Sequence, residues 1–386
     1  MRIGWLISGD ESTGDAQMVR GLAGAMRGRG HAPIILSLGD GRLCRDCEQR
    51  GLETLRLGLP SPAGFGGAAP LRPLAYWRSV RLQRREVAPF VNAARTAQLD
   101  ALHIIWPNML VLAGEAARTL GIPCIWEVQN ILSSRYPFKL NQRLLQRLAA
   151  KYHFTILAMS SMVAQRLGER PVRPVLFYLG ADERRFTPEA ADPTLRGQFE
   201  IPEGTTTIGM FARLVPEKAC DRVIEALARL RSSRPDLHLL LVGGPLESPH
   251  AQLLRSLAAR LGLGAAVHMV GAVSDPERYY GAIDIVASVR IDPEPFGLAV
   301  VEAMLMRKPV LAHALGGPSE TVVDGITGWH IHDASVDSIT AGLARAMAER
   351  SRWNEMGEAA RTRALERFSL ARQAEQYLMI LKEICD

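Results

Sequence analysis

Two carboxylate residues, Glu294 and Glu302, give this sequence its strongest chemical signal. Glu294 is followed by Phe296 and Gly297, and Glu302 lies within a helical pattern that starts at Leu298. Eight positions are about two helical turns, so both carboxylates can lie on the same side of the chain. A helix start suits a phosphate, and a carboxylate accepts hydrogen bonds from the hydroxyls of a ribose or another polyol. Phosphate, ribose and sugar together describe a nucleotide-sugar.

A buried strand, a glycine turn and a second helix are expected directly after these carboxylates. The apolar run 308–312 predicts the strand, Gly316 and Gly317 predict the turn, and Pro318 opens the helix. The block 267–331 resembles the C-terminal domain of the family 4 retaining glycosyltransferases, which have the GT-B fold. The hallmark of that family is a Glu, seven residues and a second Glu, with Phe-Gly after the first.

Further matches extend the resemblance over most of the chain. Residues 179–182, with Phe186 and Pro188, resemble the start of the family's second domain, and residues 212–218 resemble its phosphate-binding loop. The resemblance implies an α/β protein with two Rossmann-like domains whose parallel sheets face a central cleft. Residues 1–178 would form the N-terminal Rossmann-like domain that binds the acceptor, joined by a C-terminal helix at about 370–386. Residues 179–369 would form the C-terminal Rossmann-like domain that binds the nucleotide-sugar.

Composition and periodicity agree with that architecture. At 386 residues, with 47% hydrophobic and 22% charged residues, the chain predicts a soluble globular protein with two domains. No apolar run approaches a membrane span, and the apolar start is too short for a signal peptide, so we expect a cytoplasmic protein. The five cysteines, including Cys44 and Cys47, are expected to be free thiols. Buried strands alternate with helices and predict parallel sheets at 101–106, 123–128, 155–159, 207–211, 237–242, 267–270 and 283–289.

The resemblance also assigns roles to individual residues. Glu294, Arg213, Lys218 and Gln129 would be catalytic, with Arg213 and Lys218 holding the donor phosphates. Seven further residues would bind substrate: Gly14, Phe296, Gly297, Leu298, Glu302, Gly243 and Ala272. In these roles Glu302 holds the ribose, Glu294 holds the sugar, and the backbone at Ala272 pairs with the base.

The sequence departs from the family pattern at several of these positions. Gln129 stands where the family tends to have a His, and a Gln can orient a sugar hydroxyl but cannot shuttle a proton. Gly14 follows Thr13 where the family usually has Gly-Gly, and Ala212 and Ala219 replace glycines. No nucleophilic carboxylate is evident, and the family's retention of configuration is usually explained by front-face attack. No Asp-x-Asp motif occurs, and the expected reaction needs no metal and no cofactor.

Positive charge is concentrated in the first half of the chain. Residues 1–180 hold 23 Lys and Arg against 12 Asp and Glu, whereas the remainder holds 23 against 28. Two basic helices carry much of that charge: Arg135, Lys139, Arg143, Arg147 and Lys151 in one, and Arg78, Arg81, Arg84 and Arg85 around Trp77 in the other. One interpretation is docking on the anionic inner face of the membrane or on a lipid-diphosphate acceptor; the other is a solvated arginine-rich surface. No motif for nucleic acid accompanies the charge.

Several functions remain open on the sequence alone. The leading hypothesis is a retaining glycosyltransferase that moves a sugar from a UDP- or GDP-sugar to an acceptor glycan or lipid-linked sugar, in cell-surface polysaccharide or glycolipid assembly. A sugar phosphorylase on the same fold, a natural-product glycosyltransferase with a soluble acceptor and a non-catalytic nucleotide-binding subunit are the alternatives.

Overall fold

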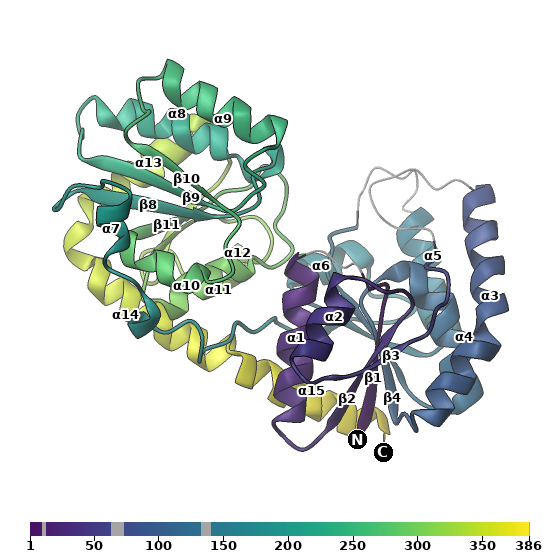
Figure 1. Cartoon of the computed structure of the whole chain (residues 1–386). Helices are drawn as coiled ribbons and strands as arrows, with labels where there is room; N and C mark the ends of the chain where they lie inside the picture. The colour runs from purple at the N-terminus through teal and green to yellow at the C-terminus, as the bar shows by residue number, and fades with distance from the viewer. Residues whose placement is uncertain (10–12, 63–72, 133–139, 386) are drawn as a thin grey trace. The chain divides into compact units, whose positions relative to one another are not determined.

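The structure, a computed structural model, describes residues 1–9, 13–62, 73–132 and 140–385. These residues divide into two compact units, 1–179 with 370–386 and 180–369. Each unit is an α/β layered structure built on one sheet (Figure 1), and every strand pair within the two sheets is parallel.

The sheet of the first unit has seven strands in the order β3-β2-β1-β4-β5-β6-β7. Its strands are β1 (Arg2–Ile7), β2 (Ala32–Ser37), β3 (Glu53–Arg56), β4 (Ala101–Ile104), β5 (Cys124–Val128), β6 (Phe154–Ala158) and β7 (Val175–Leu176). The central strands β4 and β5 are buried throughout. A strand covered by helices on both faces cannot alternate polar and apolar residues, which explains the continuous apolar runs in the sequence.

Helices cover both faces of this sheet. They are α1 (Thr13–Arg27), α2 (Arg42–Gln49), α3 (Pro73–Thr96), α4 (Leu110–Leu120), α5 (Leu140–Lys151), α6 (Ser161–Leu167) and α15 (Leu370–Cys385). The helices α1, α2 and α15 share one core with the sheet, and α4 packs on the sheet beneath α3. Although α15 is the last helix of the chain, it packs beside α1 and places Tyr377 next to β1 and β4.

The sheet of the second unit has six strands in the order β10-β9-β8-β11-β12-β13. They are β8 (Thr206–Phe211), β9 (Leu237–Val242), β10 (Val267–Gly271), β11 (Ile285–Ser288), β12 (Val310–His313) and β13 (Gly328–Ile331). The order reverses direction between β8 and β11, and such a switch point is where open parallel sheets bind ligands, beyond the carboxyl ends of the strands.

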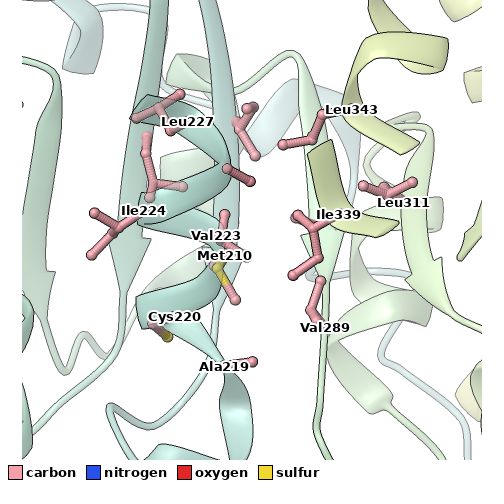
Figure 2. Close-up of a cluster of buried hydrophobic side chains, with 14 of the residues drawn as sticks. Met210, Ala219, Cys220, Val223, Ile224, Leu227, Val289, Leu311, Ile339 and Leu343 are labelled. Atoms are coloured by element: carbon pink, nitrogen blue, oxygen red, sulfur yellow. The ribbon is translucent and has the colours of Figure 1, made fainter. Parts of the chain in front are cut away.

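The helices of the second unit also form two layers. They are α7 (Leu195–Gln198), α8 (Cys220–Arg231), α9 (Pro249–Arg260), α10 (Pro276–Tyr279), α11 (Leu298–Leu305), α12 (Pro318–Thr321), α13 (Val336–Ala348) and α14 (Trp353–Arg367). Apolar side chains of α8, α9 and α13 fill the core on one face, where Val223, Leu227, Ile339 and Leu343 are buried together (Figure 2). The helices α11 and α14 pack against each other on the opposite face.

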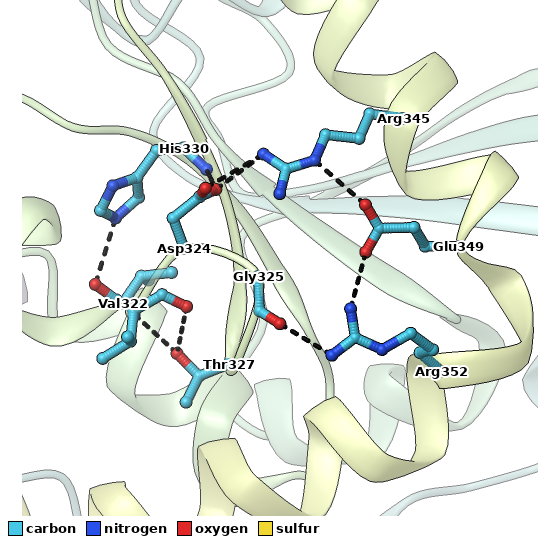
Figure 3. A network of polar contacts seen from close by, with 9 residues as sticks. Val322, Asp324, Gly325, Thr327, His330, Arg345, Glu349 and Arg352 are labelled. Atoms are coloured by element: carbon cyan, nitrogen blue, oxygen red, sulfur yellow. Dashed lines mark hydrogen bonds and ion pairs between the residues drawn. The ribbon is translucent and has the colours of Figure 1, made fainter.

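A polar cluster fixes the turn before β13 to the end of α13 (Figure 3). Asp324 accepts hydrogen bonds from Arg345, at 2.9 and 3.1 Å, and from the backbone N–H of His330. Glu349 accepts from Arg345 and Arg352, and Arg352 donates to the carbonyl of Gly325. Burial acts to raise the pKa of Asp324, but these hydrogen bonds outweigh it and the pKa is lowered. The ionised side chains of this cluster therefore stabilise the turn before β13.

Element boundaries differ from the sequence predictions by a few residues. The strand predicted at 101–106 ends at Ile104, and the one predicted at 283–289 covers Ile285–Ser288. The helix expected from Pro318 is a single turn that ends at Thr321. Most of the loop predicted at 60–73 lies outside the described residues. Among the described residues no helix is both long and apolar enough to cross a bilayer.

Candidate active site

Glu294 lies in a cluster of opposite charges in the second unit. It follows β11, and its carboxylate pairs with Lys218 through Oε2 and with Nη1 of Arg290 at 3.3 Å through Oε1. The Lys218 and Glu294 side chains are mostly buried. Lys218 comes from the loop after β8, so residues 76 positions apart in sequence meet here. The structure thus brings together a predicted phosphate ligand and a predicted sugar ligand.

Arg290 is a member of this cluster that the sequence reasoning missed. It pairs with both oxygens of Asp292, at 2.6 and 3.1 Å, as well as with Glu294. Burial acts to lower the pKa of Arg290, but its carboxylate partners raise it overall. The carbonyl of Arg290 also lies 2.6 Å from Nδ1 of His313. The residue type alone did not indicate this role, because an arginine in a loop is usually solvated. The signal that the sequence did offer was the position of Arg290, four residues before Glu294.

The glycine turn after β12 allows the Glu294 loop to approach closely. The backbone N–H of Gly317 donates to the carbonyl of Glu294 at 2.8 Å, and the backbone N–H of Glu294 donates to the carbonyl of Leu315. A Cβ on Gly316 would lie 2.1 Å from the Glu294 carbonyl oxygen, and one on Gly317 would lie 2.2 Å from that of Phe296. Gly316 also has φ of +90°. Both glycines are therefore required to position the loop.

The helix start expected at Leu298 is confirmed as the first residue of α11. Gly297 is its N-cap, with φ of +87° in the left-handed region, and no side chain caps the helix. Phe296 is buried and anchors the chain just before the helix. Glu302 is buried in the second turn of α11. Burial, followed by the charge of Glu302, raises the pKa of the Tyr280 hydroxyl, which places that carboxylate near Tyr280.

The loop after β8 presents the second predicted phosphate ligand. Arg213 is 69% exposed, and its guanidinium lies 3.9 Å from Glu217. Ala219, at the N-terminus of α8, has φ of +50° and is fully buried. This left-handed conformation is the physical reason why the family prefers glycine there. The Cβ of Ala219 contributes to the core, which explains how the departure is accommodated (Figure 2).

Gly243 and Ala272 lie where the loops after β8, β9 and β10 pack backbone against backbone. The N–H of Gly243 donates to the carbonyl of Gly271 at 2.8 Å. A Cβ on Gly243 would lie 1.8 Å from the carbonyl oxygen of Ala212, and one on Gly244 would lie 3.1 Å from the nitrogen of Ala272. Both predicted ligands are thus at the carboxyl edge of this sheet, together with the Arg213 loop.

The remaining two predicted residues belong to the first unit. Gly14 is the second residue of α1, the helix that follows β1. Gln129 directly follows β5 and is buried, with 7% of its surface exposed. Its amide nitrogen donates to Glu127 at 3.3 Å. Within the described ranges, no group of three or more His, Cys, Asp or Glu side chains has the arrangement of a metal site.

Sequence models of two known protein families match the two halves of the chain. Residues 13–180 match the sequence model of a "Glycosyl transferase 4-like domain", and residues 191–363 match that of "Glycosyl transferases group 1". The matched segments contain all eleven predicted site residues. The chain therefore belongs to the family 4 glycosyltransferases, enzymes with the GT-B fold.

Curated relatives match over part of their length. The lipopolysaccharide 1,2-N-acetylglucosaminetransferase of Salmonella typhimurium is 32% identical over 190 residues, 47% of this chain and 50% of the relative. A GDP-mannose-dependent α-(1-6)-phosphatidylinositol monomannoside mannosyltransferase of Mycolicibacterium smegmatis is 32% identical over 196 residues, 48% of this chain and 50% of the relative. The chain spans about half the length of these two relatives.

Solved structures match over nearly the whole chain. HepE of Anabaena, in complex with UDP and glucose, has a TM-score of 0.80 and 25% identity and covers 99% of both chains. WaaG, a glycosyltransferase involved in lipopolysaccharide biosynthesis, has a TM-score of 0.67 and 18% identity, over 98% of this chain and 99% of that one. The fold prediction, two parallel-stranded Rossmann-like sheets in a GT-B protein, is confirmed.

Proposed function

We propose that the protein is a retaining glycosyltransferase that moves a sugar from a UDP- or GDP-sugar to an acceptor hydroxyl. The observation that carries this proposal is the contact of Lys218 and Arg290 with Glu294, just before the uncapped start of α11. It combines cations for a diphosphate, a carboxylate for sugar hydroxyls and a helix start for a phosphate oxygen.

The ion pair suggests how the donor is recognised. The diphosphate attracts Lys218, and Arg213 is exposed and available to turn toward the same phosphates. When Lys218 turns to the phosphate, Glu294 keeps Arg290 as a partner and its Oε2 is released for sugar hydroxyls. Glu302 then holds the ribose from the second turn of α11. Donor binding in this scheme exchanges one ion pair for another, so no charge is left buried and unpaired.

In the proposed reaction the acceptor hydroxyl attacks on the side from which the diphosphate leaves. The leaving phosphate takes the acceptor proton, and Arg213, Lys218 and the α11 start stabilise the charge that develops on it. Neither a titrating His at position 129 nor a metal is needed in this scheme. The positive side chains close to the leaving group supply the stabilisation that a metal ion would otherwise provide.

The acceptor proposed here is a glycolipid or a growing cell-surface glycan. The activities of the two curated relatives, on lipopolysaccharide and on a phosphatidylinositol mannoside, support that class. Arg143, Arg147 and Lys151 are exposed on α5, whereas Arg135 and Lys139 lie outside the described residues. On α3, Trp77 is 64% exposed and lines a hollow of about 290 Å³ with Arg81, Arg84 and Arg85. We propose that these cations hold the enzyme at the inner face of the membrane.

A thermal-shift screen of nucleotides and nucleotide-sugars tests this function. A nucleoside diphosphate that binds only the folded protein stabilises it by about 2.7 kcal/mol at a concentration of 100 times Kd. We expect UDP or GDP, and the corresponding sugar donor, to raise Tm, while AMP and inorganic phosphate have little effect. Nucleoside diphosphate released together with a glycosylated acceptor identifies a transferase, whereas a sugar phosphate formed with inorganic phosphate identifies a phosphorylase. No shift with any nucleoside diphosphate contradicts the proposal.

A further inference from the structure

A chain of buried polar side chains lies behind Gln129 in the first unit. Tyr377 of α15 has its hydroxyl 2.7 Å from Nδ1 of His103 in β4, and Nε2 of His103 lies 3.2 Å from Oε2 of Glu127 in β5. Oε1 of the same carboxylate accepts from the amide nitrogen of Gln129 at 3.3 Å. His103 and Tyr377 are fully buried, and Glu127 is 3% exposed. Side chains of β4, β5 and α15 therefore form one buried series of polar contacts.

The chemistry of these groups fixes the direction of each contact. An ionised carboxylate only accepts hydrogen bonds, so Gln129 must turn its NH2 group toward Glu127. When Nδ1 of His103 accepts from the Tyr377 hydroxyl, the ring N–H is on Nε2, which faces the same carboxylate at 3.2 Å but without the geometry of a hydrogen bond. Burial, and then the charge of Glu127, raises the pKa of Tyr377 well above its ordinary value, so the phenol keeps its proton. Trp5 stacks on the His103 ring with centroids 5.6 Å apart and restrains it further.

This arrangement leaves one atom of Gln129 without a partner. Its Oε1 is buried and has no hydrogen bond within the described part of the chain. Leaving a buried acceptor unpaired is unfavourable, so such an atom indicates a place for a donor. Gln129 follows the carboxyl end of β5, the edge at which parallel sheets bind ligands, and the next residue, Asn130, is exposed. A ligand hydroxyl is the donor that suits this place.

We propose that Glu127, held by His103 and Tyr377, is a positioning residue that presents Oε1 of Gln129 to a sugar hydroxyl of the substrate. The inference rests on the proposed function, because it requires a sugar in the site. It assigns a role to three residues that the sequence reasoning did not select. It also gives α15 a part in the reaction, since the Tyr377 hydroxyl comes from that helix.

Steady-state kinetics on a set of four variants, Gln129→Met, Glu127→Gln, Tyr377→Phe and the double variant Glu127→Gln/Gln129→Met, tests the proposal. The probes are UDP-glucose and GDP-mannose, with water as acceptor and then with p-nitrophenyl glycosides. We expect Gln129→Met to lower kcat/KM about tenfold through the lost hydrogen bond. Glu127→Gln allows the Gln129 carboxamide to flip, and Tyr377→Phe removes a contact that holds His103. We therefore expect smaller losses of kcat/KM in these two variants, of about threefold to tenfold.

The decisive result is the double variant. A residue that acts only through the Gln129 carboxamide has nothing left to position once that carboxamide is gone. We therefore expect the double variant to be no slower than Gln129→Met alone, whereas independent structural damage would multiply the two losses. The control is Tyr152→Phe, which removes another buried tyrosine's hydrogen bond, 2.9 Å to Glu115, in the same unit. It should lose stability but keep wild-type kcat/KM.

Comparing hydrolysis with transfer shows whether the hydroxyl belongs to the transferred sugar or to the acceptor. A loss already present in hydrolysis identifies a hydroxyl of the transferred sugar, and a loss confined to transfer identifies a hydroxyl of the acceptor. If the glycosides accept no sugar, hydrolysis alone decides. Unchanged kcat/KM in Gln129→Met, or multiplied losses in the double variant, overturns the inference while the nucleotide binding of the second unit stands. A wild type that binds neither UDP nor GDP instead contradicts the proposed function, and the inference falls with it.

Discussion

At the scale of single residues, the two predicted phosphate-binding cations, Arg213 and Lys218, differ in exposure and in their carboxylate partner. Arg213 is exposed and lies 3.9 Å from Glu217, whereas Lys218 is mostly buried and pairs with Glu294. We therefore expect the two residues to contribute differently to phosphate binding. In the proposed scheme Lys218 gives up an ion pair to bind the diphosphate, so we expect its net contribution to be reduced by the pair it leaves.

Replacing either cation by Ala should weaken binding of the nucleoside diphosphate. A hydrogen bond to a charged group is worth about 1.5–3 kcal/mol, so we expect a loss of roughly 10- to 100-fold in affinity for Arg213→Ala. Lys218→Ala should lose less, because the wild type breaks the Lys218–Glu294 pair on binding. Isothermal titration calorimetry measures both, with Arg260→Ala, an exposed residue at the end of α9, as control. Unchanged affinity in both variants would remove the phosphate assignment.

Gly316 tests whether the position of Glu294 depends on the glycine turn. Gly316→Ala brings a Cβ within 2.1 Å of the Glu294 carbonyl oxygen and should displace that loop. Gly325→Ala is the matched control, because Gly325 also has positive φ, +72°, but a Cβ there meets only Arg345 at 3.5 Å. We expect both to lower Tm and only Gly316→Ala to lower kcat/KM, by at least tenfold. Equal activities in the two variants would argue against the packing requirement.

At the scale of elements, the sequence predicted those parts of the fold that local patterns specify. Buried parallel strands such as β9 and the start of α11 were predicted because apolar runs and a Phe-Gly break are local signals. The partners of Glu294 and Glu127 were not predicted. Arg290 lies only four residues from Glu294, but a loop arginine gives no signal by its type alone, and the role of His103 depends on β4 and β5 being neighbours in the sheet. Tyr377 lies 274 positions from His103, so no sequence window contains both.

The neighbouring strands β9 and β10 contain a histidine pair that should make folding sensitive to acid. Nδ1 of His238 lies 3.2 Å from Nε2 of His268, and the rings stack at 5.5 Å. Burial, followed by the charge of His268, lowers the pKa of His238 to about 4, and burial also lowers that of His268. Arg231 and Arg196 lower the pKa of His238 further, while Asp236 acts to raise it.

The sign of the pH effect follows from these shifts. Histidine in the unfolded chain takes up a proton near pH 6.5, whereas His238 in the folded protein resists protonation until about pH 4. The contribution of the neutral histidine to the free energy of unfolding is therefore fully present above pH 6.5. It is lost as the pH decreases toward 4, which lowers the free energy of unfolding by roughly 1–3 kcal/mol. Calorimetric Tm between pH 7.5 and 4.5 should decrease less steeply in His238→Gln than in the wild type. His332→Gln, at an exposed site, should keep the wild-type slope; identical slopes in all three proteins would contradict this account.

At the scale of the whole molecule, the uneven charge predicts where the enzyme works. The exposed arginines of α3 and α5 lie in the first unit, which carries the excess of positive charge. Each basic residue near an anionic surface contributes about 1 kcal/mol, and the attraction fades as salt screens it.

Reversing two of these charges should weaken membrane binding measurably. We expect Arg143→Glu/Arg147→Glu to bind phosphatidylserine vesicles at least tenfold more weakly than the wild type at low salt, with donor hydrolysis unchanged. Arg255→Glu/Arg260→Glu on α9 makes the same change in net charge in the second unit and serves as control. Vesicle co-sedimentation measures both. A wild type without preference for anionic over neutral vesicles would exclude membrane docking and favour a soluble acceptor.

The central claim is that the second unit binds a nucleotide-sugar with a division of labour between Glu302 and Glu294. The most direct test is calorimetry with the nucleoside diphosphate and the nucleotide-sugar on Glu302→Gln and Glu294→Gln. Because Glu302 holds the ribose, its substitution should weaken both ligands equally, by about tenfold. Because Glu294 holds the sugar, its substitution should leave the nucleoside diphosphate at least as tightly bound as in the wild type and weaken only the nucleotide-sugar. Equal losses of both ligands in Glu294→Gln would contradict the account.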